Sequence, residues 1–155
     1  MKRPAWPARG WREVEPFPFA GARRAFTGAG SGRNIPVRNF RRPGGRGLVA
    51  LARFTRRVEG ATGLAHGGAI LAVLDEALGA AAWVEGIPVF TVRLSAEFRK
   101  GVPIPSELLV ETELYKRRRR LVWVRGSLLG KDGARFARAD AEFFELDEER
   151  ARRLR

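Results

Sequence analysis

Residues 68–83 read GAILAVLDEALGAAAW and contain no proline. Apolar residues recur there at three- and four-residue spacing, which is typical of a helix with one apolar face. They are Ile70, Val73, Leu74, Ala77, Leu78 and Ala81. We expect this segment to be the central helix of the fold. At 1.5 Å per residue, a helix of about 18 residues is about 27 Å long, enough to lie across several strands.

The next segment, residues 90–98, reads FTVRLSAEF, with apolar residues at the even positions and polar residues at the odd ones. This alternation predicts a strand with one buried face. Further strands are predicted at 37–40, 47–54, 107–115, 121–129 and 135–146, and a short helix after Asp147, where acids precede bases. The order of elements predicts an α+β fold, a single antiparallel sheet that packs on one long helix.

The chain of 155 residues is long enough for one domain with a real core. We divide it into an N-terminal tail rich in Pro, Gly and Arg without regular structure (1–34), the domain (35–147), and a short basic C-terminal tail or helix (148–155). The tail contains Trp6, Trp11, Phe17, Phe19 and Phe26. Because these rings carry large apolar area, the question whether part of the tail docks on the domain stays open.

Composition excludes several classes of chemistry. The chain has no Cys and one His, so it lacks a Cys nucleophile, a disulfide framework and a Cys/His zinc cage, and we expect no metal. No apolar run approaches the roughly 18 residues of a membrane helix, and no apolar stretch follows Met1-Lys2-Arg3 as in a secretory signal. We therefore expect a soluble, cytoplasmic protein that does not bind membranes.

The net charge of +13 is concentrated in the N-terminal part. Residues 1–58 carry 14 Lys and Arg against 2 acids, whereas residues 59–155 carry 16 against 15. Such a charge attracts polyanions, so nucleic-acid binding through this half and Arg117–Arg120 is one hypothesis. We disfavour it, because the tail has no recognised binding motif and a charge run is usually a solvated face.

The helix is entered through His66, Gly67 and Gly68. Glycines are poor helix formers, but without side chains they let a ligand approach the free amides at the helix start. There the helix dipole favours an anion or a developing oxyanion. The alternative interpretation is structural: the glycines allow tight packing and His66 caps the helix.

Asp75 interrupts the apolar helix and must be solvated, paired or shifted in pKa. Its helical neighbours are mostly small: Gly68, Leu71, Ala72, Leu78, Gly79 and Ala82. A strip of small residues beside a carboxylate lets a substrate or another backbone approach it. Glu76 lies further round the helix. The alternative is that Asp75 is exposed on a solvated face.

These residues carry a family resemblance. His66-Gly67-Gly68 with Asp75 nine positions after the His, followed by FRKGVPIP at 98–105, resembles the HGG-type, PaaI-like hotdog acyl-CoA thioesterases over about residues 35–146. The resemblance implies a hotdog fold, with the sheet wrapped around the central helix. It also implies a homodimer or homotetramer with the active site between two subunits.

The resemblance also assigns residue roles. It places the nucleophile or general base at Asp75 and the carbonyl-polarising amide at Gly67, whereas Glu76 has no chemical role. His66 and Gly68 would position the thioester, and Thr91 would place substrate or water. Several members have an Asn six residues before the His, where this chain has Gly60; what takes the place of that Asn is open.

We therefore expect an acyl-CoA thioesterase that needs no cofactor, coenzyme A being part of the substrate. A helix-start amide and a carboxylate supply the electrophilic pocket and the base that thioester hydrolysis needs. For the phosphates of coenzyme A we consider Arg99 and Lys100 of a neighbouring subunit, or Arg117–Arg120; the alternative is that these are solubilising surface charges. A non-catalytic acyl-CoA-binding module on the same fold remains an alternative. The acyl chain cannot be predicted.

Overall fold

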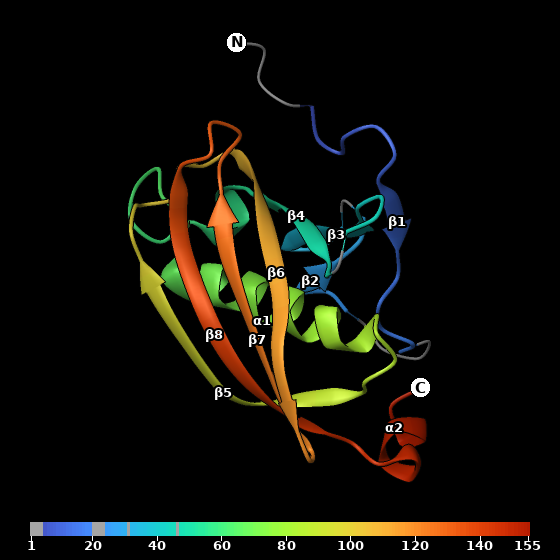
Figure 1. Ribbon diagram of the computed structural model, residues 1–155. Helices are drawn as coiled ribbons and strands as arrows, with labels where there is room; N and C mark the ends of the chain where they lie inside the picture. The colour runs from blue at the N-terminus through green and yellow to red at the C-terminus, as the bar shows by residue number, and fades with distance from the viewer. Residues whose placement is uncertain (1–4, 20–23, 31, 46) are drawn as a thin grey trace.

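The computed structural model describes residues 5–19, 24–30, 32–45 and 47–155. It consists of one sheet and one long helix with short additions at both ends (Figure 1). The strands are β1 (Arg12–Val14), β2 (Thr27–Gly28), β3 (Ile35–Arg41), β4 (Val49–Phe54), β5 (Val89–Phe98), β6 (Ser106–Arg118), β7 (Leu121–Leu129) and β8 (Arg135–Glu145). The helices are the 3₁₀ turn η1 (Arg56–Val58), α1 (Gly67–Trp83) and α2 (Glu148–Arg153).

The sheet has eight strands, with the main order β1-β3-β4-β6-β7-β8-β5 and β2 beside β3. Every pair is antiparallel except β2 with β3. Strands β6, β7 and β8 form a meander, and β5 returns from the helix to the outer edge of β8. The predicted α+β fold, an antiparallel sheet around one central helix, is confirmed.

Helix α1 is wrapped by the sheet (Figure 1). The residues that periodicity assigned to its apolar face are buried, and Val73, Leu74, Ala77 and Leu78 are fully inaccessible. They belong to one core with inward-facing residues of the sheet, which include Val110, Val122, Val124, Leu128, Ala139 and Phe143. Because each fully buried Leu or Val contributes about 1.5–3 kcal/mol, this contact fixes the position of the helix.

The N-terminal segment differs from the sequence prediction. β1 pairs with β3 and so extends the sheet, and β2 also pairs with β3. The absence of regular structure predicted for 1–34 is therefore wrong for Arg12–Val14 and Thr27–Gly28; residues 1–4, 20–23 and 31 lie outside the described part. The segment also docks: Trp11 packs on Phe40, with ring centroids 5.9 Å apart. This contact belongs to a second apolar cluster, separate from the core around α1.

Strand β5 also departs from prediction. It is the edge strand. Leu94 and Ala96 of the predicted face pack against the core, but Phe90, Val92 and Phe98 are each about half exposed (50%, 52% and 50%), so the prediction of a buried face is wrong for these three residues. The register slips between Thr91 and Arg93, which makes Val92 a β-bulge. A bulge reverses the alternation on one side of it. Thr91 therefore lies opposite the buried Phe143, on the helix side of the sheet.

The short C-terminal helix α2 forms as the acid-then-base pattern predicts. Asp147 is its N-cap and accepts a hydrogen bond from the Arg150 amide at 2.8 Å. That hydrogen bond lowers the pKa of Asp147. Acids in the first turn and bases in the last complement the helix dipole.

Candidate active site

The start of α1 presents one free amide. His66 is the N-cap, and its Nδ1 accepts a hydrogen bond from the Gly68 amide at 2.9 Å. The amides of Ala69 and Ile70 donate to the His66 carbonyl, whereas the Gly67 amide donates to no group of the described residues. Gly67 and Gly68 are exposed. The structural role of His66 as a cap and the open Gly67 amide are thus both present, and they do not exclude each other.

Gly60 stands where several hotdog thioesterases have Asn, and the structure gives a physical reason for glycine. A Cβ at Gly60 would lie 2.8 Å from the Cα of His66, closer than real Cβ atoms come to another carbon. The Gly60 amide donates to the Leu64 carbonyl at 2.9 Å, and the His66 amide donates to the Val58 carbonyl at 2.7 Å. The loop is folded so tightly on His66 that this backbone leaves no room for an Asn side chain.

Asp75 and Thr91 lie together. The Thr91 hydroxyl donates a hydrogen bond to Asp75 Oδ1 at 2.7 Å. Asp75 is half-buried beside Leu78 and Ala82 of the same helix, and the Val92 bulge turns Thr91 toward it. Within the described residues no side chain donates to Asp75 Oδ2, so this oxygen is available to a substrate or a water.

Gly67 and Asp75 do not lie together within one chain. They are eight residues apart in the same helix, which is about 12 Å along its axis. A reacting carbonyl must lie within roughly 3–3.5 Å of both its hydrogen-bond donor and its nucleophile. One chain therefore holds two half-sites, His66 and Gly67 at the helix start and Asp75 with Thr91 in its middle.

Glu76, to which the sequence assigned no role, anchors the N-terminal segment. Its side chain is only 8% exposed and forms an ion pair with Arg24 at 2.5 Å. Thr27 also donates a hydrogen bond to it. Sequence reasoning missed this contact, because the partners are 52 and 49 residues away and no pattern connects them.

A cavity of about 410 Å³ opens beside Asp75. Asp75 and Thr91 line it together with two small helix residues, Ala72 and Gly79, from the strip that the sequence indicated. The remaining lining is mainly aromatic: Phe17, Phe19, Phe26, Trp83 and Phe143, with Arg24, Thr27, Glu76 and Val89.

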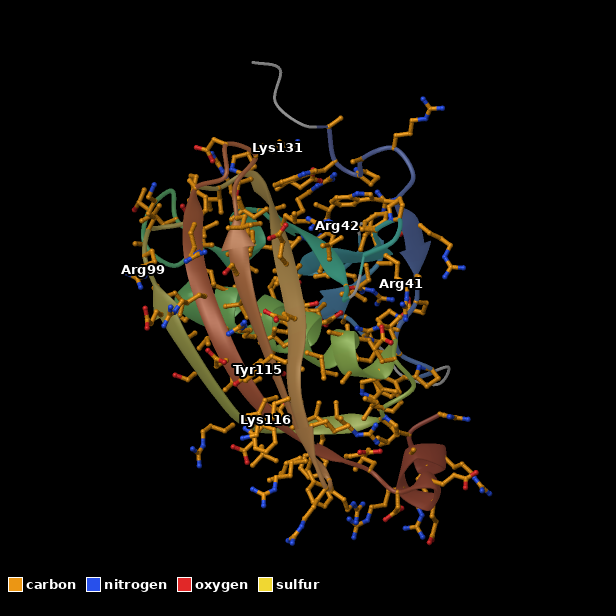
Figure 2. The ribbon with its side chains drawn as sticks, in the orientation of Figure 1. Arg41, Arg42, Arg99, Tyr115, Lys116 and Lys131 are labelled. Carbon is orange, nitrogen blue, oxygen red and sulfur yellow. The ribbon has the colours of Figure 1, made fainter. Side chains whose placement is uncertain are left out.

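The candidate phosphate-binding residues lie at two separate places. Arg99 ends the edge strand, far from Tyr115 and Lys116 (Figure 2), and forms an ion pair with Glu97 at 2.6 Å. Lys100 follows it and has no ion-pair partner among the described residues. The neighbouring Phe98 ring packs beside the helix start, 3.9 Å from where a Cβ of Gly67 would be. Arg99 and Lys100 thus lie near the Gly67 end of the helix, whereas Asp75 lies in its middle.

The basic run 117–120 is partly neutralised. Arg117 forms a double hydrogen bond with Glu145, and Arg120 pairs with Asp147 at 3.5 Å. Arg118 and Arg119 are exposed and have no ion pair with a described residue.

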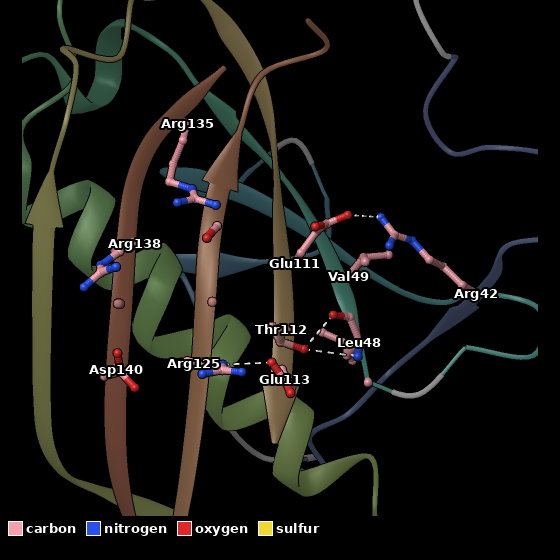
Figure 3. Close-up of a pocket in the computed structure, with 14 residues that line it drawn as sticks. Arg42, Leu48, Val49, Glu111, Thr112, Glu113, Arg125, Arg135, Arg138 and Asp140 are labelled. Atoms are coloured by element: carbon pink, nitrogen blue, oxygen red, sulfur yellow. Dashed lines mark hydrogen bonds and ion pairs between the residues drawn. The ribbon is translucent and has the colours of Figure 1, made fainter. Parts of the chain in front are cut away.

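A second cavity, of about 550 Å³, lies on the opposite face of the sheet (Figure 3). Ion pairs line it, among them Arg42 with Glu111 at 2.5 Å and Arg125 with Glu113 at 2.8 Å. The hydrogen bond from Arg125 to Glu113 raises the pKa of Arg125. None of the predicted site residues line this cavity, and a third arginine of its lining, Arg138, pairs with Glu97 at 3.1 Å. It is a charged surface hollow and not the site of the predicted chemistry.

The described residues contain neither a metal-binding cluster nor a membrane-spanning helix. No three side chains of His, Cys, Asp or Glu in this part of the chain lie close enough together to hold a metal ion. No helix among those residues has the length and apolar character to span a bilayer.

Residues 62–137 match the family model of the thioesterase superfamily. Acyl-coenzyme A thioesterase THEM4 of Rattus norvegicus is 32% identical over 101 residues, which cover 64% of this chain and 44% of that protein. This part of the chain is similar to the thioesterase superfamily, and the chain has the hotdog fold. It spans less than half the length of this curated relative.

Solved structures agree with the hotdog fold. A hypothetical thioesterase protein of Streptococcus pneumoniae superimposes with a TM-score of 0.63 at 17% identity, covering 66% of this chain and 85% of that one. The E. coli PaaI protein from the phenylacetic acid degradation operon gives 0.61 at 12% identity, over 64% of this chain and 72% of that one. The resemblance to PaaI-like hotdog thioesterases is confirmed; at these identities the structures establish only the fold.

The Streptococcus pneumoniae protein is also known with coenzyme A and as two alanine variants. One variant replaces a Thr and the other an Asp, and the two positions are 16 residues apart. Asp75 and Thr91 of this hotdog domain have the same separation of 16.

The close approach at Gly60 generates a prediction about the cap. Gly60→Ala should displace the His66 backbone, because the new Cβ would lie 2.8 Å from its Cα. We expect a loss of about 1–3 kcal/mol in the free energy of unfolding, measured by urea titration. Gly63→Ala serves as the control, because there a Cβ meets nothing within 4 Å, although its positive φ adds some strain. A larger loss at Gly63 than at Gly60 would refute the assigned contact.

Proposed function

We propose that this protein hydrolyses acyl-CoA thioesters to the free acid and coenzyme A, with Asp75 as nucleophile or general base. The observation that carries the proposal is the Asp75–Thr91 hydrogen bond at the mouth of an aromatic-walled cavity. The fold, the family match and the relative named as an acyl-CoA thioesterase support it. So does the shared spacing of Asp and Thr with the protein that is known with coenzyme A.

The Gly67 amide polarises the thioester carbonyl in this proposal. It is the free donor at the N-terminus of a 17-residue helix, where the helix dipole adds to its hydrogen bond. Charge develops on the carbonyl oxygen as the carbon becomes tetrahedral, so this amide binds the transition state more strongly than the ground state. Because Nδ1 of His66 already accepts the Gly68 amide, Nε2 carries the proton in the neutral ring and can donate to the substrate.

Asp75 supplies the attack on the carbonyl carbon. Its Oδ1 is held by Thr91, and Oδ2 either bonds to the carbon or accepts a proton from the attacking water. When Asp75 is the nucleophile, the carbon–sulfur bond breaks to give the thiolate and an acyl anhydride on Asp75; a water then hydrolyses the anhydride, which frees the acid and Asp75 and supplies the proton of the thiol. When Asp75 is the base, the proton that it takes from the attacking water passes to the sulfur as the carbon–sulfur bond breaks. In both forms the net reaction consumes one water and yields the acid and the thiol.

The two half-sites must come from two copies of the chain, so we propose a homodimer as the smallest active unit, alone or within a homotetramer. β5 is an edge strand with exposed apolar residues, and an uncovered edge favours pairing. Antiparallel pairing of two β5 strands places the Thr91 end of one beside the Phe98 end of the other. Since Phe98 packs beside Gly67, each Asp75 then faces the partner's helix start.

The same arrangement brings Arg99 and Lys100 of one copy near Asp75 of the other, where the phosphates of coenzyme A would approach. Lys100 is unpaired among the described residues, and the Arg99–Glu97 pair is exposed and therefore weak. We assign the phosphates to these two residues in preference to Arg117–Arg120, because Arg99 and Lys100 lie beside the helix start that this pairing of β5 brings to the partner's Asp75.

The nucleic-acid hypothesis loses support from the basic half of the chain. Arg24, Arg38, Arg41, Arg42 and Arg53 all form ion pairs with acids. These pairs reduce the number of cations that a polyanion could bind, although Arg9, Arg12, Arg33, Arg56 and Arg57 form no ion pair with a described residue.

Asp75→Asn should reduce kcat for acyl-CoA at least about 1,000-fold, because the amide keeps the shape and loses the base. Thiol release is the measurement. Glu85→Gln, which removes an exposed carboxylate just beyond α1, should keep activity within about twofold. Acyl-CoA binding with no hydrolysis by the wild type would favour the alternative of a non-catalytic module, and retained hydrolysis in Asp75→Asn would refute the mechanism.

A complementation experiment tests the shared site. Gly67→Pro removes the polarising amide but suits the first position of a helix, and His66 already has the extended backbone that precedes proline. Each variant alone should be inactive. Mixed oligomers of Asp75→Asn and Gly67→Pro chains should regain activity, up to about half that of wild type per mixed dimer, because one of the two sites is intact. No recovery in co-expressed, tag-purified mixtures would contradict the two-subunit site.

Charge reversal tests the phosphate assignment. The double variant Arg99→Glu, Lys100→Glu should raise KM for acyl-CoA about tenfold or more and leave KM for the matching acyl-pantetheine, which lacks the nucleotide, unchanged. Arg118→Glu, Arg119→Glu is the matched control at the other basic cluster. An equal response of both substrates would show that the charges act through assembly or stability.

A further inference from the structure

The cavity beside Asp75 owes much of its wall to a part of the chain outside the 62–137 family match. Phe17, Phe19 and Phe26 come from the N-terminal segment, whereas the family match begins after η1. We call these three residues the N-terminal aromatic wall. The hotdog elements contribute the opposite wall, Trp83 at the end of α1 and Phe143 of β8.

Two residues of the N-terminal aromatic wall, Phe17 and Phe19, pack on Trp83 at the end of the helix. Phe17 and Phe19 stack with ring centroids 5.4 Å apart, and both meet the Trp83 ring edge-on, at 6.3 and 5.3 Å. Such offset and edge-to-face pairs are favourable beyond the burial of their area. The rings therefore have a defined position over the cavity.

A buried ion pair holds this wall in place. Arg24 binds Glu76, whose side chain is 8% exposed, and its guanidinium also lies 4.7 Å from the centre of the Phe17 ring. Thr27 donates to the same carboxylate and begins the pairing of β2 with β3. Detaching the segment would leave Glu76 as an unpaired, largely buried charge, which is costly.

The cavity has its polar and apolar groups at different places. Asp75 and Thr91 provide the reactive polar groups. Ala72 and Gly79 are small and leave space beside them, and most of the remaining lining is aromatic. A volume of about 410 Å³ is within the range of pockets that bind small molecules. This arrangement suits a ligand with a reacting carbonyl at one end and an apolar body.

We propose that Phe17 and Phe19 contact the acyl chain and select apolar acyl groups of several carbons over acetyl. The inference rests on the proposed function, which supplies the thioester at Asp75, and adds the substrate class and the residues that choose it. An acetyl group has a single methyl group to bury against the rings. A longer apolar chain displaces water from them and gains the transfer free energy of each buried methylene.

The test compares octanoyl-CoA with acetyl-CoA. In the double variant Phe17→Ala, Phe19→Ala the ratio of kcat/KM for octanoyl-CoA to that for acetyl-CoA should fall at least about tenfold. Trp11→Ala is the matched control, because it removes a ring of the same segment that packs on Phe40, away from the cavity, and it should change the ratio less than about twofold. An equal fall in Trp11→Ala would overturn the proposal.

A second variant tests the cavity without touching the N-terminal segment. Ala72→Leu adds bulk to the cavity beside Asp75 and keeps a good helix former, so it should lower the ratio of kcat/KM for octanoyl-CoA to that for acetyl-CoA. An unchanged ratio in this variant and in the double Phe variant would overturn the proposal.

Binding measurements separate this inference from the proposed activity. Wild type should bind the non-hydrolysable thioether S-octyl-coenzyme A at least about tenfold more tightly than coenzyme A, and the double Phe variant should lose that difference. If the wild type shows this preference and hydrolyses no thioester, the activity proposal fails and the assignment of the wall stands. Suppose instead that hydrolysis depends on Asp75, but the double Phe variant changes neither the kcat/KM ratio of octanoyl-CoA to acetyl-CoA nor the affinity for S-octyl-coenzyme A. The activity proposal then stands and the assignment of the wall fails.

Discussion

The burial of one face of α1 in the curved sheet is the constraint on which the rest of this structure depends. Val73, Leu74, Ala77 and Leu78 are fully inaccessible, so the helix can neither rotate nor slide without exposing them. The same packing places Asp75 against Thr91 of β5 and the N-terminal segment, and it places the helix start beside Phe98 at the other end of β5. Both half-sites thus take their positions from core packing.

The same constraint explains which features the sequence could predict. The helix, the meander and α2 follow from patterns within single segments, and their limits agree with prediction to within a few residues. Asp75 and the helix start could be predicted as well, since an acid within an apolar face and glycines at a helix entry are local anomalies. Each of these signals lies within one element.

The features that sequence reasoning missed depend on contacts between elements. The alternation at 90–98 predicts Thr91 on the polar face, and only the bulge at Val92 turns it toward Asp75. A bulge arises from pairing with β8, so the sequence of β5 alone contains no sign of it. Likewise, Glu76 has the appearance of a surface acid until Arg24 and Thr27, about fifty residues earlier, are folded onto it.

The rigidity of α1 also bears on why a catalytic site on this fold should need two copies. Eight helical residues separate Gly67 from Asp75 by about 12 Å, and no side-chain rearrangement shortens a distance that the backbone hydrogen bonds of the helix fix. A loop could bend to bring the two groups together; a buried helix cannot. In the proposed homodimer the donor and the carboxylate meet across the symmetry axis, with the exposed edge strand β5 between them. The packing that fixes the position of each half-site therefore also keeps the two half-sites of one chain apart.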